Sequence, residues 1–254
     1  NFFVCCGLNS IGIGSGGGVG KVTAEWLMTG HINQDIFSYD IKRFQKFHSE
    51  LSFIKKRITE TLGDLYGMHW PFKQHKTSRN IKTLPYHDDL KSFGACFGVS
   101  GGYERPMWFA LDGEKTEYEY SYNYQNWYPS AEYETNNTIK NVGLFDLTPF
   151  SKFEIKSDKA HDELQRICTA NIKNEIGKCT YTQMLNSDGG IETDLTIVCI
   201  DSNHFRIISS AATRERDKFH IKKHLSNGIE LYDVTDDYCV FGLFGPKSRD
   251  LIKS

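Results

Sequence analysis

Several features that would assign a function directly are missing from this 254-residue chain. No run of about 18 apolar residues occurs, which excludes a transmembrane helix and membrane insertion. The formal net charge is −2 and no lysine or arginine block stands out, so neither a nucleic acid nor a membrane surface is expected as a partner. The H-E-x-x-H motif is also absent, which excludes a zinc-protease helix.

Metal sites and disulfide frameworks lack support as well. The seven cysteines are odd in number and none forms a C-x-x-C pair, so a reducing compartment is favoured. Cys5, Cys6 and Cys199 lie in apolar runs and are expected in the core. His69, His75 and His87 are spaced too irregularly to predict a metal site, and surface loop histidines explain them.

What is present is an ordinary globular composition, 39% hydrophobic and 24% charged, which allows a sizeable core. Expected strands and helices alternate irregularly, which favours an α+β fold over a doubly wound sheet. The chain enters a β-type run at Asn1 and stops in a helical segment, so we expect an internal piece of a longer polypeptide.

The first thirty residues predict a strand, a glycine loop and a helix. Residues 2–6 are apolar and predict a buried strand, residues 7–20 are dense in glycine, and residues 21–29 have helical spacing before Gly30. Further along, the pattern predicts helices over 49–66, from 85 to about 93, 160–168 and 211–224, with a long loop over 69–83. Strands are predicted over 95–99, 107–110, 142–146, 153–155, 179–186, 195–200, 205–209 and 238–243.

The glycine loop contains a formal G-x-G-x-x-G at Gly12, Gly14 and Gly17, which is weak where glycine is so dense. No second apolar strand ends in an acid at the distance that a dinucleotide fold needs, and the Walker pattern fails after Lys21. Bare backbone N–H groups at a helix N-terminus could contact an electron-rich ligand. A tight turn without a ligand is the alternative, and we favour ligand contact.

A second candidate is the segment from Tyr181 to Asp194. Residues 187–190 are a hairpin turn, which would place Tyr181 and Asp194 near each other on paired strands. Aspartate is depleted in strands, so Asp194 is either functional or a strand-edge or turn-capping residue, and the residues alone leave both open. The acids Asp233, Asp236 and Asp237 predict a solvated turn, and residues 214–217 a charged helix start.

Motifs in order along the chain resemble the dimethylglycine and sarcosine dehydrogenase family. Residues 7–13 with Ala24-Glu25-Trp26 resemble the last strand, loop and helix of that family's FAD domain, and residues 53–55, 62–66 and 69–71 resemble its central segment. The start of its folate-binding domain, which is similar to the aminomethyltransferase (T-protein) of glycine cleavage, is resembled by residues 94–98, 103–108, 143–148, 181–186, 189–191 and 244–246.

The resemblance implies three parts: residues 1–36 as the C-terminal end of an FAD-dependent oxidoreductase domain, 37–83 as a central connecting domain, and 84–254 as a truncated T-protein-like folate-binding domain. It also implies two-step chemistry. FAD oxidises the N-methyl group of an N-methylated glycine, and tetrahydrofolate captures the one-carbon unit. The electron acceptor would be an electron-transfer flavoprotein or oxygen, in the cytoplasm or, in a eukaryote, the mitochondrial matrix.

The resemblance also implies site residues. It places the glycine-rich loop beside the flavin ring, where backbone donors stabilise negative charge; the residues it implicates in FAD binding are Gly7, Leu8, Asn9, Ser10, Ile11 and Gly12. The family's key folate carboxylate matches Asp194, expected to orient the folate and manage its proton, and Tyr181 matches a nearby folate-contacting tyrosine. The alternatives are a non-catalytic or regulatory folate-domain protein and a free-standing aminomethyltransferase acting with a lipoyl carrier.

Overall fold

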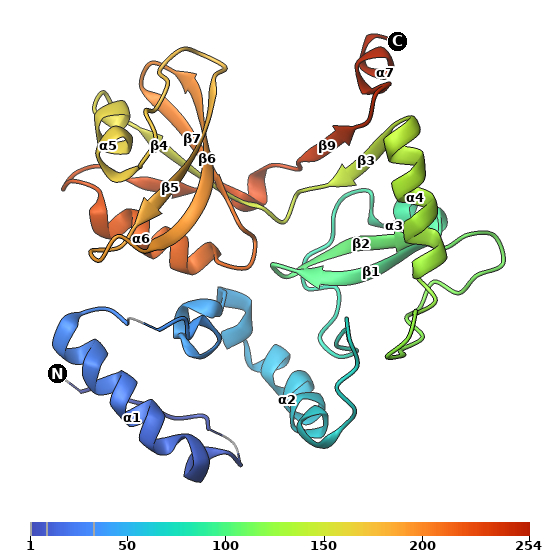
Figure 1. Ribbon diagram of the computed structural model, residues 1–254, viewed down its shortest axis with the longest axis horizontal. Coiled ribbons are helices and arrows are strands. Elements are labelled where there is room, and N and C mark those ends of the chain that lie inside the picture. Colours follow the sequence, from blue (N-terminus) through green and yellow to red (C-terminus); the bar gives the residue numbers. More distant parts are fainter. Residues whose placement is uncertain (1, 9, 33) are drawn as a thin grey trace. The chain divides into compact units, whose positions relative to one another are not determined.

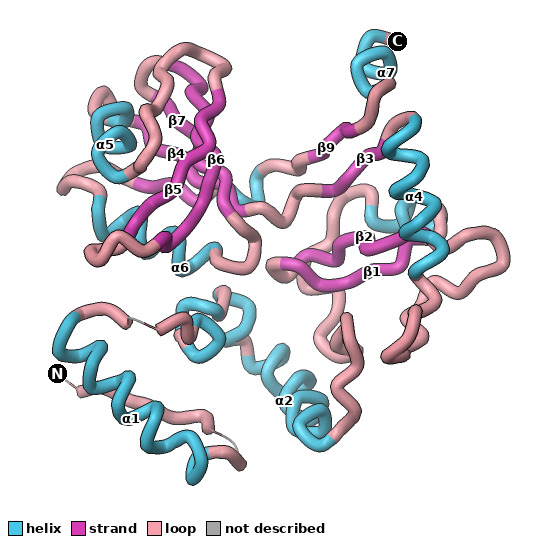
Figure 2. The backbone as a smooth tube through the Cα atoms, in the orientation of Figure 1, coloured by secondary structure: helices cyan, strands magenta, loops and turns pink. Residues whose placement is uncertain are grey.

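The computed structural model describes residues 2–8, 10–32 and 34–254. The chain divides into two compact units, Asn1–Arg43 and Phe44–Ser254, and each is described here by itself. Figure 1 labels the helices and strands, and Figure 2 colours the same backbone by secondary structure. The mixture of helices with antiparallel strands confirms the α+β class.

The first unit is built around α1, Gly12–Thr29, which ends at Gly30 in the left-handed conformation (φ 78°). Two short 3-10 turns follow, η1 at Phe37–Tyr39 and η2 at Ile41–Arg43. The C-terminal stop at Gly30 is as predicted, because glycine adopts a positive φ without strain.

The predicted loop over residues 7–20 is wrong from Gly12 onward, since these residues form the first half of α1. A Cβ added at Gly14, Gly16, Gly17, Gly18 or Gly20 would meet nothing within 4 Å, so no neighbouring group imposes a turn there. A helix started by residues 21–29 can extend upstream, because each added residue gains one backbone hydrogen bond. Glycine lowers that gain by about 1 kcal/mol but does not prevent it.

The predicted buried strand over residues 2–6 is also wrong. These residues have no regular secondary structure and are exposed, including Cys5 and Cys6. A strand needs a neighbour to pair with, and no described strand pairs with this segment. Its contacts are with α1 instead: the Phe3 ring meets the Trp26 ring edge-on at 5.6 Å.

The second unit opens with η3 (Lys46–Ser49) and α2 (Leu51–Tyr66), whose buried Phe53 anchors it. A smaller group of elements follows the long loop: α3 (His87–Ser92), β1 (Ala95–Ser100), β2 (Tyr103–Phe109), α4 (Tyr128–Lys140) and β3 (Gly143–Asp146). Strands β1 and β2 form an antiparallel hairpin, and β3 pairs with β9 (Phe241–Phe244), which precedes α7 (Ser248–Lys253).

The main core lies under a five-stranded antiparallel sheet of order β5-β6-β7-β4-β8. Its strands are β4 (Ser151–Lys156), β5 (Cys179–Leu185), β6 (Ile191–Asp201), β7 (His204–Ser209) and β8 (Leu231–Asp233). Helices α5 (Ala160–Ile167) and α6 (Arg214–His224) contribute Leu164 and Ile221 to the same core as Phe153, Ile197 and Cys199. The opposite sheet face, called the outer face below, carries the polar alternate residues.

Most predicted elements of this unit are found, but α4 and β8 were not predicted. The sequence of α4 contains few apolar residues and no regular apolar stripe, and β8 has three residues. Short or polar elements give weak periodicity and depend on the surfaces they contact. The burial of Cys199 is confirmed.

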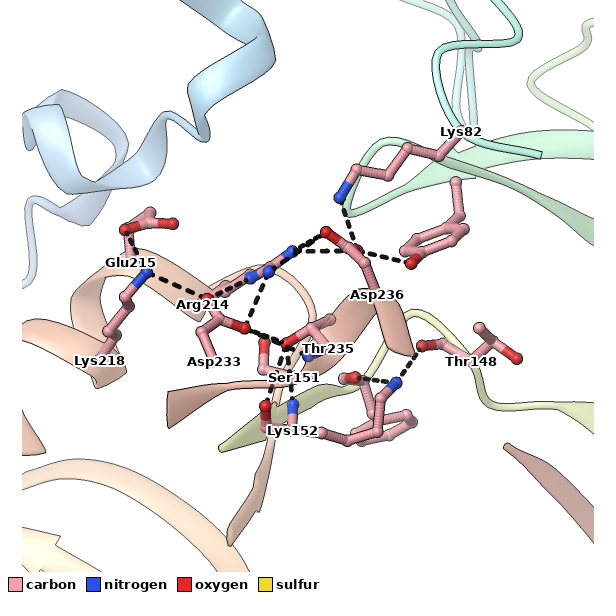
Figure 3. Close-up of polar contacts among 12 residues, drawn as sticks. Lys82, Thr148, Ser151, Lys152, Arg214, Glu215, Lys218, Asp233, Thr235 and Asp236 are labelled. Atoms are coloured by element: carbon pink, nitrogen blue, oxygen red, sulfur yellow. Dashed lines mark hydrogen bonds and ion pairs between the residues drawn. The ribbon is translucent and has the colours of Figure 1, made fainter. Parts of the chain in front are cut away.

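The turn predicted to be solvated around residue 233 is instead part of an ion-pair network (Figure 3). Arg214 donates to both Asp233 oxygens, at 2.8 and 3.0 Å, and both side chains are nearly buried. Asp236 accepts hydrogen bonds from Lys82 Nζ at 2.8 Å and Tyr103 Oη at 2.6 Å. The solvated interpretation is therefore wrong for Asp233, because residues distant in sequence enclose it.

Candidate functional site

The candidate folate site lies on the β5–β6 hairpin. Thr193, Leu195 and Ile197 point into the core, and this alternation fixes Asp194 on the outer face. The turn is closed by Asn186, whose Oδ1 accepts hydrogen bonds from Asp188 N at 3.0 Å and Gly190 N at 2.8 Å. The predicted hairpin is confirmed. Its register is fixed by the buried residues of β6 and by the turn that the Asn186 side chain closes.

Tyr181 and Asp194 lie together, as the hairpin predicted. The Tyr181 hydroxyl donates to Asp194 Oδ2 at 2.9 Å, although the two residues are not directly opposite in the ladder. This hydrogen bond to a carboxylate raises the pKa of Tyr181, so the phenol keeps its proton. Within the described chain no hydrogen bond reaches Asp194 Oδ1, and Tyr181 is 62% exposed. One carboxylate oxygen is thus held in place while the other is open to a ligand donor.

This pair fits what a reduced pterin requires. A ring N–H is a hydrogen-bond donor, and an oriented carboxylate oxygen on an open sheet face can accept it. Half-buried Gln183 and Thr196 flank the pair on the same face, opposite Asp194 and Tyr181 in the ladder. The arrangement can therefore orient a planar, nitrogen-rich ligand.

The residues expected at a flavin lie before and at the start of α1. Gly7 has φ 90° and Ser10 has φ 61°, and Ile11 N donates to Leu8 O at 2.8 Å, which forms a tight turn into Gly12. Ile11 O accepts from Ser15 N at 3.0 Å, and among the described residues the N–H groups of residues 12–14, in the first turn of α1, have no intrahelical partner. These donors suit an electron-rich ring edge. Asn9 lies outside the described residues.

A buried ion cluster on the outer face was not found from the sequence. Glu154 is 2% exposed and lies among Arg206 Nη2 at 2.6 Å, His204 Nε2 at 2.9 Å and Lys156 Nζ at 3.0 Å. Burial alone would raise the pKa of Glu154, but hydrogen bonds from Arg206, Lys156 and His204 outweigh it and lower the pKa to about 2. The only sequence signal was the alternation of charged and apolar residues along β4.

A second group, Glu60, Asp64 and His75, brings three ligand-type atoms within 4.8 Å of one another. Glu60 already accepts hydrogen bonds from Lys76 N at 2.6 Å and Thr77 N at 2.9 Å, and Asp64 accepts one from Lys73 Nζ at 2.6 Å. These acids hold the segment 73–77 against α2, so we assign them a structural role.

Comparison with family models divides the chain in two. The FAD dependent oxidoreductase central domain matches residues 29–83, and the GCVT N-terminal domain matches residues 86–254. The boundaries predicted at residues 36 and 83 remain predictions.

Curated relatives match nearly the whole chain. The 4-methylaminobutanoate oxidase (formaldehyde-forming) of Paenarthrobacter nicotinovorans is 37% identical over 99% of this chain and 31% of its own length. The mitochondrial pyruvate dehydrogenase phosphatase regulatory subunit of Mus musculus is 31% identical over 99% of this chain and 29% of its own length. Human mitochondrial sarcosine dehydrogenase is 27% identical over 99% and 32%. The chain thus spans about a third of the length of these relatives.

Among solved structures, the aminomethyltransferase T of the glycine cleavage system from Bartonella henselae has a similar fold. Its TM-score is 0.56 at 20% identity, covering 68% of this chain and 43% of that one. Within the described residues, none of the helices has the length and apolar character needed to cross a membrane. Because the GCVT model covers more than half of the sequence, the chain belongs to the GCVT N-terminal domain family, preceded by an FAD oxidoreductase central domain.

Proposed function

We propose that this chain is part of an FAD- and tetrahydrofolate-dependent dehydrogenase that oxidatively demethylates an N-methylated glycine and passes the carbon to tetrahydrofolate. The observation that carries the proposal is the order of the two domains, an FAD oxidoreductase central domain followed directly by a GCVT domain. The same span aligns with sarcosine dehydrogenase and with an oxidase of another methylated amino acid.

In this proposal FAD supplies the oxidation and tetrahydrofolate accepts the carbon. Asp194 is the catalytic carboxylate: its free Oδ1 accepts a hydrogen bond from a folate ring nitrogen and holds a proton there during carbon capture. Tyr181 is a folate-binding residue that fixes Asp194 through the 2.9 Å hydrogen bond. Preorganising the acceptor in this way avoids an orientational cost at the moment of reaction.

The turn before α1 would serve the flavin. Gly7, Leu8, Asn9, Ser10, Ile11 and Gly12 would line the flavin site, and the backbone N–H groups at the start of α1, from Gly12 onward, would face the ring where negative charge develops. We propose no residue here for the methylated amine itself. The electron acceptor would be an electron-transfer flavoprotein or oxygen, in the cytoplasm or the mitochondrial matrix.

The test is Asp194→Asn in the complete enzyme. Amine oxidation, followed by flavin reduction, should persist, while the yield of methylenetetrahydrofolate per oxidised amine should fall by about tenfold or more, the range of a lost general acid–base group. Asp162→Asn on α5, whose side chain is 88% exposed, is the matched control and should leave both readouts unchanged. An unchanged folate yield in the Asp194 variant would refute the assignment.

A regulatory role is the second candidate, because a phosphatase regulatory subunit is 31% identical over nearly the whole chain. The two candidate functions differ in whether the complete protein oxidises a methylated amino acid. A complete protein that holds no flavin after desalting and oxidises none of sarcosine, dimethylglycine and 4-methylaminobutanoate would favour the regulatory role.

A further inference from the structure

A cavity lies away from the β5–β6 hairpin, between β2, β3 and α4, which Figure 1 shows beside one another. Its volume is about 360 Å³, in the range of small-molecule pockets. The residues that matter for its chemistry are charged ones, Arg105, Glu134 and Asp146, and aromatic ones, Trp108, Tyr133 and Phe145. A cation, acids and apolar walls therefore share one small cavity.

Arg105 supplies a cation without a counter-charge. Its Nε donates to the backbone carbonyl of Asp146 at 3.1 Å, which holds the guanidinium in the cavity wall. Across the described residues it forms no other hydrogen bond, and no carboxylate lies within 4.0 Å of it. The remaining N–H donors form a planar fork whose usual partner is a carboxylate.

Glu134 supplies an acid without a cation. Its Oε1 accepts a hydrogen bond from Phe109 N at 2.7 Å, which ties α4 to β2. No lysine, arginine or histidine of the described chain pairs with it. Burial raises the pKa of Glu134, and the hydrogen bond from Phe109 only partly opposes this. An ammonium group beside Glu134 would compensate for that burial.

Asp146 adds a second unmet acceptor at the cavity wall. It is 8% exposed, and Oδ1 accepts from Thr148 N at 2.9 Å. Its buried Oδ2 has no partner in the described chain. Buried acceptors without a partner are rare in folded proteins, because each has lost its hydrogen bonds to water without replacement. The cavity therefore combines unmet donors on Arg105 with unmet acceptors on Glu134 and Asp146.

We propose that this cavity binds a small amino acid as its zwitterion, with Arg105 on the carboxylate and Glu134 on the ammonium. The exposed aromatic side chains of Tyr133 and Phe145 cover the aliphatic part. This site goes beyond the proposed function, because it places an amino acid in the GCVT domain rather than at a flavin, and needs neither cofactor.

The test is calorimetric titration of the chain with glycine and with 4-aminobutanoate, which differ in the spacing of the two charges. At least one should bind with one-to-one stoichiometry, and methylammonium and acetate, each lacking one charge, should bind roughly tenfold more weakly or worse. Neither zwitterion binding at millimolar concentration would overturn the proposal.

Three variants locate the binding. Arg105→Gln should lose at least about tenfold in affinity, and Glu134→Gln should weaken the zwitterion but not acetate. Leu144→Trp tests the same volume without touching a charge: Leu144 lines the cavity and is 65% exposed, so the indole can fill the space without disturbing the core. Arg249→Gln on α7, an exposed arginine, is the control.

Wild-type affinity in both Arg105→Gln and Leu144→Trp would show that the amino acid binds elsewhere. These titrations contain no folate or flavin, so their failure leaves the proposed function untouched.

Discussion

Glu154 is a carboxylate held almost entirely out of water beside Arg206, Lys156 and His204, and these surroundings decide its contribution to stability. Arg206 Nε and Nη2 both donate hydrogen bonds to Glu154 Oε1. The guanidinium carbon of Arg206 lies 4.2 Å from the centroid of the Tyr238 ring. Removing one member of a buried ion pair leaves the other without compensation, which costs more than the pair contributes.

Glu154→Gln should therefore destabilise the second unit by about 3 kcal/mol, because Arg206 loses its counter-charge while the side-chain volume is kept. Urea unfolding followed by tryptophan fluorescence measures this as a lower midpoint. Glu175→Gln, an exposed glutamate in the loop before β5, is the control and should shift the midpoint little. Equal midpoints for the two variants would contradict the account of the cluster.

Acid should destabilise this unit by protonating carboxylates that, like Glu154, accept hydrogen bonds in the folded state. The pKa values of Glu154 and Glu60 are lowered from 4.5 to about 2, and that of Asp236 from 3.8 to about 2; in each, hydrogen bonds outweigh burial. Since the folded pKa lies below the unfolded one, the stability they add is complete above pH 4.5 and is lost as the pH falls toward 2.

The free energy of unfolding should then decline steadily between pH 4.5 and 2, measured by urea titration at each pH. In Glu154→Gln one of the three groups is gone, so the decline should be shallower. A variant with the wild-type slope would show that Glu154 does not carry this pH dependence.

At the scale of elements, α1 is a helix whose first half is mostly glycine. Gly16, Gly17 and Gly18 have helical backbone and open space where a Cβ would stand. Gly7 and Gly30 are different, since their φ values of 90° and 78° suit glycine and strain other residues.

Replacing Gly16, Gly17 and Gly18 together by alanine should increase helicity, with about 1 kcal/mol gained at each position. The signal at 222 nm in circular dichroism and its thermal midpoint measure the effect. Gly30→Ala is the contrasting variant and should lower the midpoint, because alanine is strained at that φ. A loss of helicity in the triple variant would mean that residues 16–18 are not helical.

For the second unit as a whole, the network of Figure 3 joins segments that are far apart in sequence. Asp236 lies 154 residues from Lys82 and receives hydrogen bonds from it, from Tyr103 and from Arg214. Lys82 belongs to the segment matched by the central-domain model, whereas Asp236 belongs to the GCVT domain. The network therefore fastens the two matched domains to each other within this unit.

A double-mutant cycle on Lys82→Met and Asp236→Asn should give a coupling energy of about 1 kcal/mol or more, because the Lys82 side chain is 23% exposed and Asp236 has further partners. The reference cycle is Lys115→Met with Glu119→Gln. These two exposed residues lie four apart in the loop before α4, and their ion pair is expected to couple by less than about 0.5 kcal/mol. Denaturant midpoints of the wild type, the four single variants and the two double variants supply both values, and equal coupling in the two cycles would argue against a fastening role.

The sequence determined the local structure of the second unit to a large extent. The β5–β6 hairpin followed from its turn residues and alternation, and so did the meeting of Tyr181 with Asp194, because register is set by local chemistry. The resemblance to the dimethylglycine and sarcosine dehydrogenase family rested on short motifs in order, and the two matched domains agree with it.

Only the tertiary structure decided which distant charges meet. Glu154 finds Arg206 because β4 and β7 are neighbours in the sheet, and Arg105 and Glu134 share a cavity because α4 lies beside β2. Residues 2–6 have strand-like composition, but no described strand pairs with them, and the glycines of α1 are helical because no described group near them requires a turn. Periodicity and turn chemistry act over a few residues, whereas ion pairs, cavities and strand partners depend on contacts between segments that the sequence does not order in space.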